Sequence, residues 1–171
     1  MILKKMRIRQ FRNYEDQTLM FDQGIQYITG RNAQGKTNLL EAILYLSTTR
    51  SHRVNDDAEL IKESRDFFLI NGTLEKGNRS IELRIHVSKE GKNLFIYKSP
   101  IRKVSDFVGT CNAVMFCPDD LTLFQAAPRV RRRFIDMELS KMSKTYMNAL
   151  TKANRLLKER NAALKLESIN Q

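Results

Sequence analysis

A short glycine-rich turn between two regular segments restricts the fold of this chain more than any other feature. The turn reads Gly30-Arg31-Asn32-Ala33-Gln34-Gly35-Lys36-Thr37. Apolar and polar residues alternate over residues 24–29, which predicts a strand, and residues 38–46 have the apolar spacing of a helix. A strand, a turn with this spacing and a helix, in this order, form a phosphate-binding P-loop. A glycine-rich turn that ends in Lys-Thr by coincidence is the alternative, and these flanking elements argue against it.

The residue types of the turn explain how it binds phosphate. Gly30 and Gly35 let the backbone wrap tightly, so that its N–H groups point at phosphate oxygens. The following helix adds the positive end of its dipole. Lys36 is expected to reach the β- and γ-phosphates, and the Thr37 hydroxyl to hold Mg²⁺. We therefore expect a nucleotide with Mg²⁺ as the ligand, contacted by the turn and by Asn38.

The composition favours an anionic partner larger than a nucleotide. The chain of 171 residues has 30 Lys and Arg against 19 Asp and Glu, a net charge of +11. Solubility alone is the other explanation of this charge. The first ten residues lack the apolar core of a signal peptide, and no stretch is apolar enough to cross a membrane. The two cysteines are expected to be free thiols in a reducing compartment, which indicates a cytoplasmic protein. We expect no structural metal site, because the two cysteines and two histidines form no cluster.

The character of the chain changes at Pro128, after which there is no Gly or Pro. Apolar residues then recur in steps of three, four or seven, which predicts one face of a long helix. They are Leu139, Met142, Tyr146, Leu150, Ala153, Leu157 and Leu164. Before Pro128, alternating or apolar runs predict strands at residues 1–8 and 18–21, at "FFLINGTL", "RSIELRIHV" and "KNLFIYK", the last two joined by a hairpin at "SKEGK", and at "NAVMF". We expect a lobe of strands and helices over residues 1–127 and an incomplete helical arm over residues 128–171.

A P-loop ATPase usually needs a second motif, an apolar strand that ends in Asp. The segment "NAVMFCPDD" ends in Asp119 and Asp120, but Pro118 interrupts strand pairing just before them. Both aspartates also suit the start of a helix after Pro118. No glycine-rich signature of the Leu-Ser-Gly-Gly type is present. The chain thus has a phosphate cradle without evident hydrolytic machinery.

Several stretches, in order, carry a resemblance to a known family. They are "IRQFRNY" from Ile8, "GRNAQGKTNLLEAI" from Gly30, "RSHRVNDDAELI" from Arg50, "VMFCPDDL" from Val114 and "PRVRRRFIDMELS" from Pro128. Over nearly its whole length the chain resembles the N-terminal half of the RecF family of bacterial recombination mediators, which are ABC-type ATPases related to SMC proteins. The resemblance implies an α/β P-loop fold, the N-terminal lobe of an SMC-like head with a mixed sheet, and an N-terminal fragment of a longer protein.

The resemblance also implies roles for residues outside the P-loop. Arg12 and Asn13 match a turn beside the nucleotide and are candidate phosphate or adenine contacts. The segment 50–53 matches an arginine loop near nucleotide and DNA, which makes Arg50, His52 and Arg53 candidate DNA contacts. Asp119 or Asp120 falls where related heads carry a glutamine that senses Mg²⁺.

Three arginines near the start of the predicted arm, Arg129, Arg132 and Arg133, share one helix face. Cations at a helix N-terminus oppose its dipole and favour a bound anion. They are therefore candidate contacts to DNA phosphates or to the nucleotide of a partner head. A structural network with Asp136 or Glu138 explains them equally well.

The family implies an ATP-gated, dimeric clamp on DNA that serves repair, replication and the SOS response to DNA damage. It would act at single-strand gaps and single/double-strand junctions and, with RecO and RecR, help to load RecA. The intact protein would hydrolyse ATP slowly as a dimer, and this chain would bind ATP without turnover. A small P-loop kinase is the second hypothesis, which needs a complete second motif within these residues. A non-catalytic interaction protein is the third, and it leaves the P-loop unused.

Overall fold

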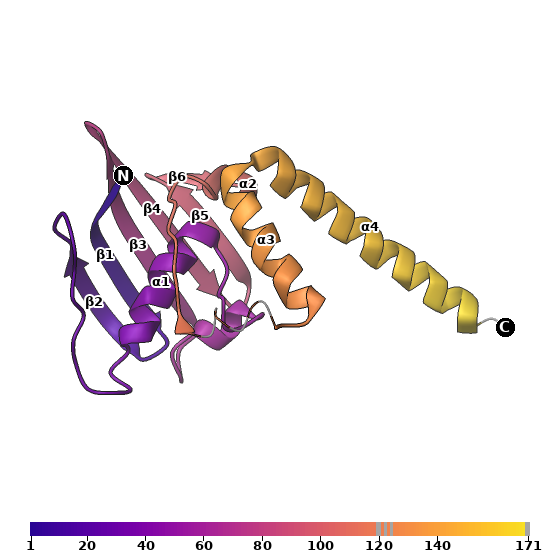
Figure 1. The fold of residues 1–171 in the computed structure, drawn as a ribbon, viewed down its shortest axis with the longest axis horizontal. Helices are drawn as coiled ribbons and strands as arrows, with labels where there is room; N and C mark the ends of the chain where they lie inside the picture. The colour runs from indigo at the N-terminus through magenta and orange to yellow at the C-terminus, as the bar shows by residue number, and fades with distance from the viewer. Residues whose placement is uncertain (119–120, 122, 124, 170–171) are drawn as a thin grey trace. The chain divides into compact units, whose positions relative to one another are not determined.

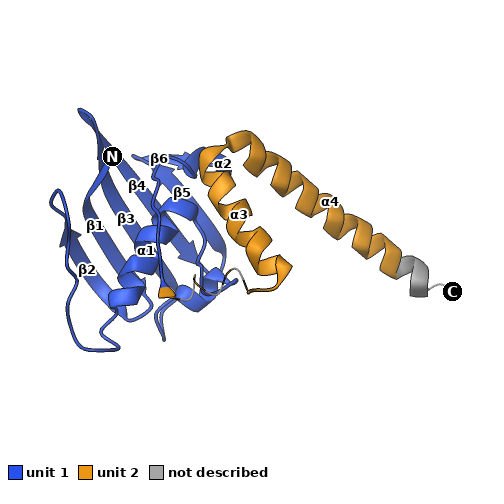
Figure 2. Ribbon diagram, in the orientation of Figure 1, with its two compact units in different colours: residues 1–117 blue, residues 118–171 orange. Residues whose placement is uncertain are grey.

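The computed structural model describes residues 1–118, 121, 123 and 125–169, and the chain divides into two compact units, residues 1–117 and 118–171 (Figure 2). The first unit contains the sheet and the P-loop, and the second contains two helices. Pro128, the first residue of the expected helical arm, is the first residue of helix α3. None of the described helices combines the length and the apolar character needed to cross a bilayer.

Six strands, each antiparallel to its neighbours, form the sheet of the first unit (Figure 1). In their order across the sheet they are β2 (Tyr14–Met20), β1 (Ile2–Phe11), β3 (Phe67–Lys76), β4 (Arg79–Ser88), β5 (Gly91–Ile96) and β6 (Ser99–Ile101). The helices of this unit are α1 (Lys36–Thr48), the short 3-10 helix η1 (Asp57–Leu60) and α2 (Val104–Phe107). The predicted hairpin at "SKEGK" is confirmed as the connection between β4 and β5.

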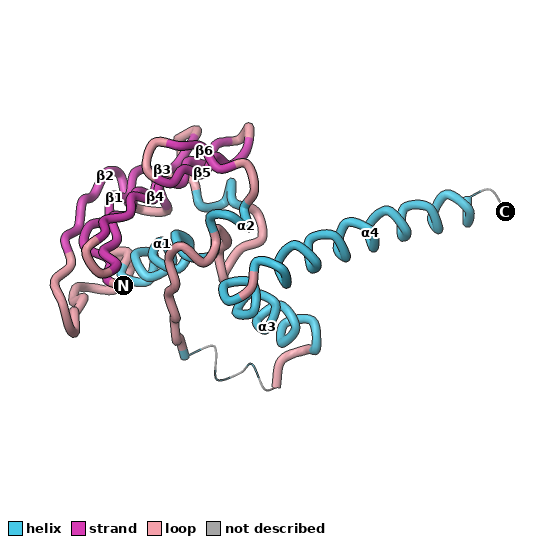
Figure 3. Tube along the Cα trace, turned by 90° about the horizontal axis from the view of Figure 1, so that it is seen from above, coloured by secondary structure: helices cyan, strands magenta, loops and turns pink. Residues whose placement is uncertain are grey.

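The core of the first unit lies between the sheet and α1, which runs along one face of the sheet (Figure 3). Alternate residues of the central strands are buried, as the period of two along a strand requires. The rings of Phe11, Tyr45 and Phe68 contact one another with centroids 5.2–6.5 Å apart. Gly72 on β3 faces Leu46 of α1 so closely that a Cβ at this position would overlap the leucine side chain. The absence of a side chain at Gly72 therefore sets how near the P-loop helix approaches the sheet.

Two predicted strands, residues 24–29 and 112–116, are not strands in this structure. Among the described residues neither segment pairs with another strand. Their apolar side chains are open to solvent, with Tyr27 85% and Val114 90% exposed. Alternation predicts a strand only where a partner strand can satisfy the backbone, and that partner is absent from the described sheet.

The second unit contains α3 (Pro128–Met142) and α4 (Lys144–Ile169). The prediction of one continuous helix from Pro128 is wrong, because Ser143 has an extended backbone with φ −137° and ψ 111°. The Ser143 Oγ accepts a hydrogen bond of 3.2 Å from the N–H of Tyr146 and so caps the start of α4. The Tyr146 hydroxyl donates to Asp136 Oδ1 at 2.6 Å, which joins the two helices. A serine side chain thus replaced a backbone hydrogen bond and ended the first helix.

Candidate nucleotide-binding site

The P-loop has the geometry of an anion cradle. Helix α1 begins at Lys36, directly after Gly35, and no side chain caps its first N–H groups. Gly35 has φ 97° and Gly30 has φ 151°, values in the left-handed region that favours glycine. The exposed N–H donors and the helix dipole at this end favour a phosphate or another anion.

The Lys36 side chain lies across the P-loop. Its Nζ donates to the carbonyl oxygens of Gly30 at 2.7 Å and Arg31 at 2.6 Å. The ammonium group therefore lies across the loop, where it can exchange these carbonyls for phosphate oxygens. Thr37, on the first turn of α1, is exposed. Arg31, Asn32, Ala33 and Gln34 are exposed as well, so the outer part of the loop is open to a ligand.

The turn between β1 and β2 packs against the end of the P-loop. Asn38 Nδ2 donates to Asn13 Oδ1 at 2.9 Å, and the Tyr14 hydroxyl donates to the Gly35 carbonyl at 3.1 Å. A Cβ on Gly35 would lie 2.6 Å from the Asn13 side-chain amide. This close approach is a second reason for glycine at position 35, besides its φ. The sequence-predicted residues Asn13 and Asn38 are thus brought together at the P-loop.

Arg12 belongs to the same turn, where its φ is 52°, and its side chain binds a buried carboxylate on α1. Its Nε and Nη2 donate to the two carboxylate oxygens of Glu41, each at 3.0 Å. Ser51 Oγ also donates to Glu41 at 2.6 Å, and Arg53 Nη1 lies 3.5 Å from it. The Glu41 side chain is 0% exposed. Burial raises its pKa, but the hydrogen bonds from Arg12 and Ser51 and the two arginine charges outweigh burial and hold the pKa below its usual value.

Glu41 is the central residue of this network, and no role was predicted for it from the sequence. It was one charged residue within the apolar stretch Leu-Leu-Glu-Ala-Ile, on the buried side of a predicted helix. A carboxylate at such a position is almost never buried without a partner, so its setting indicated an ion pair. Nothing local indicated that the partners would be Arg12 and Arg53.

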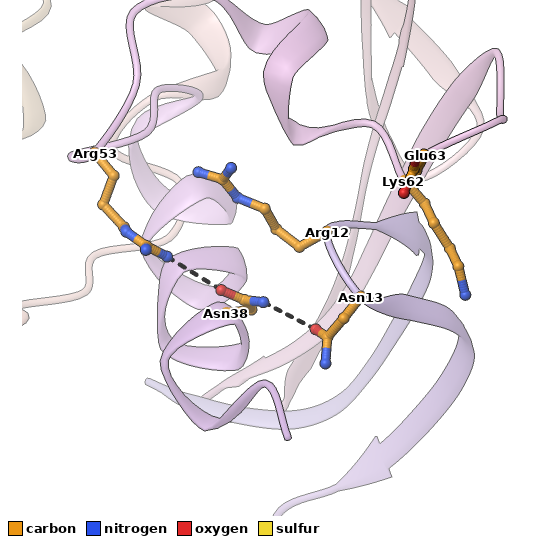
Figure 4. Close-up of a pocket in the computed structure, with 6 residues that line it drawn as sticks. All are labelled: Arg12, Asn13, Asn38, Arg53, Lys62 and Glu63. Carbon is orange, nitrogen blue, oxygen red and sulfur yellow. Dashed lines mark hydrogen bonds between the residues drawn. The ribbon is translucent and has the colours of Figure 1, made fainter. Parts of the chain in front are cut away.

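A pocket of about 570 Å³ opens beside the P-loop helix (Figure 4). Its lining residues are Arg12, Asn13, Asn38, Arg53, Lys62 and Glu63. Arg53 Nη1 donates to Asn38 Oδ1 at 3.1 Å, which continues the Asn38–Asn13 contact into a chain of three side chains (Figure 4). The three cations of the lining outnumber Glu63 and the Glu41 carboxylate that Arg12 and Arg53 contact, and this excess of positive charge suits an anionic ligand.

The remaining predicted site residues are distributed over both units. Arg50 is exposed and His52 partly buried, on the segment that follows α1. Arg129, Arg132 and Arg133 are exposed on the first turns of α3 in the second unit. Asp119 and Asp120 lie outside the described residues. Over the part of the chain that the structure describes, no group of three or more His, Cys, Asp or Glu side chains could hold a metal.

The chain matches the AAA domain family over residues 5–171. It is 43% identical over 166 residues to the DNA replication and repair protein RecF of Geobacillus thermodenitrificans (strain NG80-2), covering 97% of this chain and 45% of the relative. A solved structure of the recombination mediator protein RecF-ATP in the RecFOR pathway superposes with a TM-score of 0.91 at 32% identity, over 95% of this chain and 44% of that one.

A third comparison concerns the fold alone. The SMC head domain from Thermotoga maritima matches with a TM-score of 0.50 at 20% identity, over 60% of this chain and 39% of that one. The chain spans less than half the length of these relatives. The expected α/β P-loop fold and the resemblance to the N-terminal part of RecF are confirmed. The chain therefore belongs to the AAA domain family and is related, over nearly its whole length, to the N-terminal part of RecF, a DNA replication and repair protein and recombination mediator.

Proposed function

We propose that the P-loop binds ATP, with Lys36 on the β- and γ-phosphates and Mg²⁺ on the Thr37 hydroxyl. The observation that carries this proposal is the uncapped start of α1 behind Gly35, with the Lys36 ammonium already inside the loop. The exposed Thr37 hydroxyl is an oxygen ligand of the kind that Mg²⁺ prefers. When bound, Mg²⁺ would neutralise part of the triphosphate charge.

The protein to which this chain contributes would be an ATP-dependent homodimer that binds DNA at single/double-strand junctions. In partnership with RecO and RecR it would help to load RecA during repair. The relationship to RecF and the net charge of +11 support this proposal. The proposed contacts to the DNA backbone are Arg50, His52 and Arg53 of segment 50–53, together with Arg129, Arg132 and Arg133 at the start of α3.

The chain by itself would bind ATP without hydrolysing it. In-line attack by water requires a residue that positions the water. The described residues of the P-loop and its pocket supply cations and amides. Glu63 is the one carboxylate that lines the pocket, and its place there defines no position for an attacking water. The intact protein would hydrolyse ATP slowly, at a rate per head that rises with protein concentration.

Two measurements on the chain test the proposals that it binds ATP through Lys36 and that it does not hydrolyse ATP. Equilibrium titration with Mg-ATP should give saturable binding that the Lys36→Ala variant lacks, and binding that survives in the variant would place the nucleotide elsewhere. A steady-state phosphate-release assay should give equal rates for both proteins. Turnover that Asp119→Asn eliminates would instead identify "VMFCPDD" as the second ATPase motif and contradict the proposal of binding without hydrolysis.

A further inference from the structure

Three elements of the first unit meet on the buried carboxylate of Glu41. The carboxylate belongs to α1, Arg12 comes from the turn between β1 and β2, and Ser51 and Arg53 come from the segment that follows α1. The two arginines contact this carboxylate very unequally, and that inequality has a functional consequence.

All three nitrogens of the Arg12 guanidinium donate hydrogen bonds. Two nitrogens of its guanidinium contact the Glu41 carboxylate at 3.0 Å, and a third donates to the Glu59 carbonyl at 3.2 Å. The Arg12 side chain is 20% exposed. If Arg12 left, a fully buried carboxylate would lose its bidentate partner, which is strongly unfavourable. Arg12 is therefore a fixed cation of the fold.

Arg53 is held loosely. Only its Nη1 approaches Glu41, at 3.5 Å, and the same atom donates to Asn38 at 3.1 Å. The Arg53 side chain is 47% exposed and lines the pocket beside the P-loop helix (Figure 4). If Arg53 moved into the pocket, Glu41 would keep its contacts with Arg12 and Ser51. Arg53 can therefore exchange Glu41 for a phosphate at much lower cost than Arg12 can.

The same carboxylate also sets the backbone that carries Arg53. Ser51 Oγ donates to Glu41, and the N–H groups of Arg53 and Val54 donate to this Oγ at 2.9 and 3.1 Å. A change in the contacts of Glu41 is thus transmitted through one hydroxyl to two backbone amides.

We propose that Glu41 is a positioning residue that couples the pocket to segment 50–54. It holds Arg12 permanently and Arg53 in an exchangeable contact, so that a phosphate group entering the pocket draws Arg53 away and shifts the backbone of this segment. The inference rests on the proposed function, since the phosphate group is that of a nucleotide bound at the P-loop. Because coupling between two sites is reciprocal, an anion bound to segment 50–54 would in turn change the affinity for the nucleotide.

Hydrogen exchange at the Arg53 and Val54 amides, with and without saturating Mg-ATP, tests the proposal on the whole chain. We expect Mg-ATP to change both exchange rates by about threefold or more, which is easily resolved by this method. In Arg53→Gln, which removes the half-exposed cation together with its contacts to Glu41 and Asn38, this change should be lost. The Ser47→Ala variant is the matched control, since Ser47 is also a buried polar residue of α1 but bonds Cys111 instead. It should respond to Mg-ATP as the unmodified chain does.

Glu41→Gln separates coupling from a purely structural role. Without the carboxylate, both arginines lose their internal competitor, so the affinity for Mg-ATP at low salt should rise several-fold while stability falls. A carboxylate that only supports the fold would give lower affinity together with lower stability, and that result would overturn the proposal.

Different results would refute the proposed ATP binding and the proposed role of Glu41. If the chain shows no Mg-ATP binding that depends on Lys36, the proposed function and this inference both fall. If Lys36-dependent binding occurs but leaves the Arg53 and Val54 amides unchanged, or if Arg53→Gln retains the full change, only the role of Glu41 is refuted.

Discussion

Two positions in the first half of helix α1, Lys36 and Glu41, use their polar side chains in opposite ways. At its start, Lys36 bonds two carbonyls of an exposed loop, and the first N–H groups have no side-chain cap. Five residues later, Glu41 is fully buried and engages Arg12, Ser51 and Arg53. An exposed polar group changes partners at little cost, because water replaces each lost bond, whereas a buried carboxylate cannot lose its bidentate partner without a large penalty. The first site therefore leaves its polar groups available to a ligand, and the second holds elements together.

The largest expected effect is on stability at the second site. Glu41→Ala leaves Arg12 without its buried partner and should lower the free energy of unfolding by about 3 kcal/mol, the lower end for a broken buried pair because both arginines reach water. Chemical denaturation of the chain measures this. Ser47→Ala, on the same helix, removes the hydrogen bond that Ser47 donates to Cys111 and the one that it accepts from Ala113, and should cost only about 1–2 kcal/mol. Equal losses for the two variants would contradict the distinction between the two sites.

The next effect concerns binding at the first site. Lys36→Ala should leave the stability of the ligand-free chain nearly unchanged, since the ammonium only bonds exposed loop carbonyls. Mg-ATP at about 100 times its Kd should add roughly 2.7 kcal/mol to the unmodified chain, or about 5–10 °C in Tm. The variant should lose most of that shift in a thermal melt. A large drop in Tm without ligand would mean that Lys36 also holds the fold together.

A smaller effect is expected where the P-loop touches the turn between β1 and β2. Gly35→Ala places a Cβ at φ 97° and 2.6 Å from the Asn13 amide, and should cost about 1–2 kcal/mol. Gly77→Ala is the control, because Gly77 also has a positive φ, of 58°, but nothing lies within 4 Å of its Cβ. Denaturation midpoints of both variants compare strain alone with strain plus contact. A Gly77→Ala loss as large as that of Gly35→Ala would show that the Asn13 contact is unimportant.

The smallest effect is the pH dependence of the second site. Because the folded pKa of Glu41 lies below its value in the unfolded chain, about 4.3, its charge stabilises the fold at higher pH. That contribution should be complete above the unfolded pKa and disappear as pH falls through the folded pKa. Denaturation of the chain and of Glu41→Gln between neutral and acidic pH measures it as a narrowing difference in stability. A difference that widens on acidification would mean that burial, which opposes the two arginines, dominates.

Local pattern was sufficient for much of the fold and for the first site. The alternation in β1, β3 and β4 correctly predicted strands, and the hairpin at "SKEGK" was correctly placed. The glycine spacing of the P-loop predicted its helix and the location of Lys36. These features depend on residues within a few positions of one another, so they are present in any short window of the sequence.

Interactions between distant residues decided the rest. Residues 24–29 and 112–116 have strand-like patterns but remain unpaired, because no other part of the described chain supplies a partner strand. Arg12 was expected beside the nucleotide, and the structure places it on the pocket wall with its guanidinium on Glu41, 29 positions away. By itself the sequence determined which groups this protein can offer a phosphate. Only the tertiary structure decided which of its cations are already neutralised, because a buried charge takes its partner from whatever the fold brings within hydrogen-bond distance.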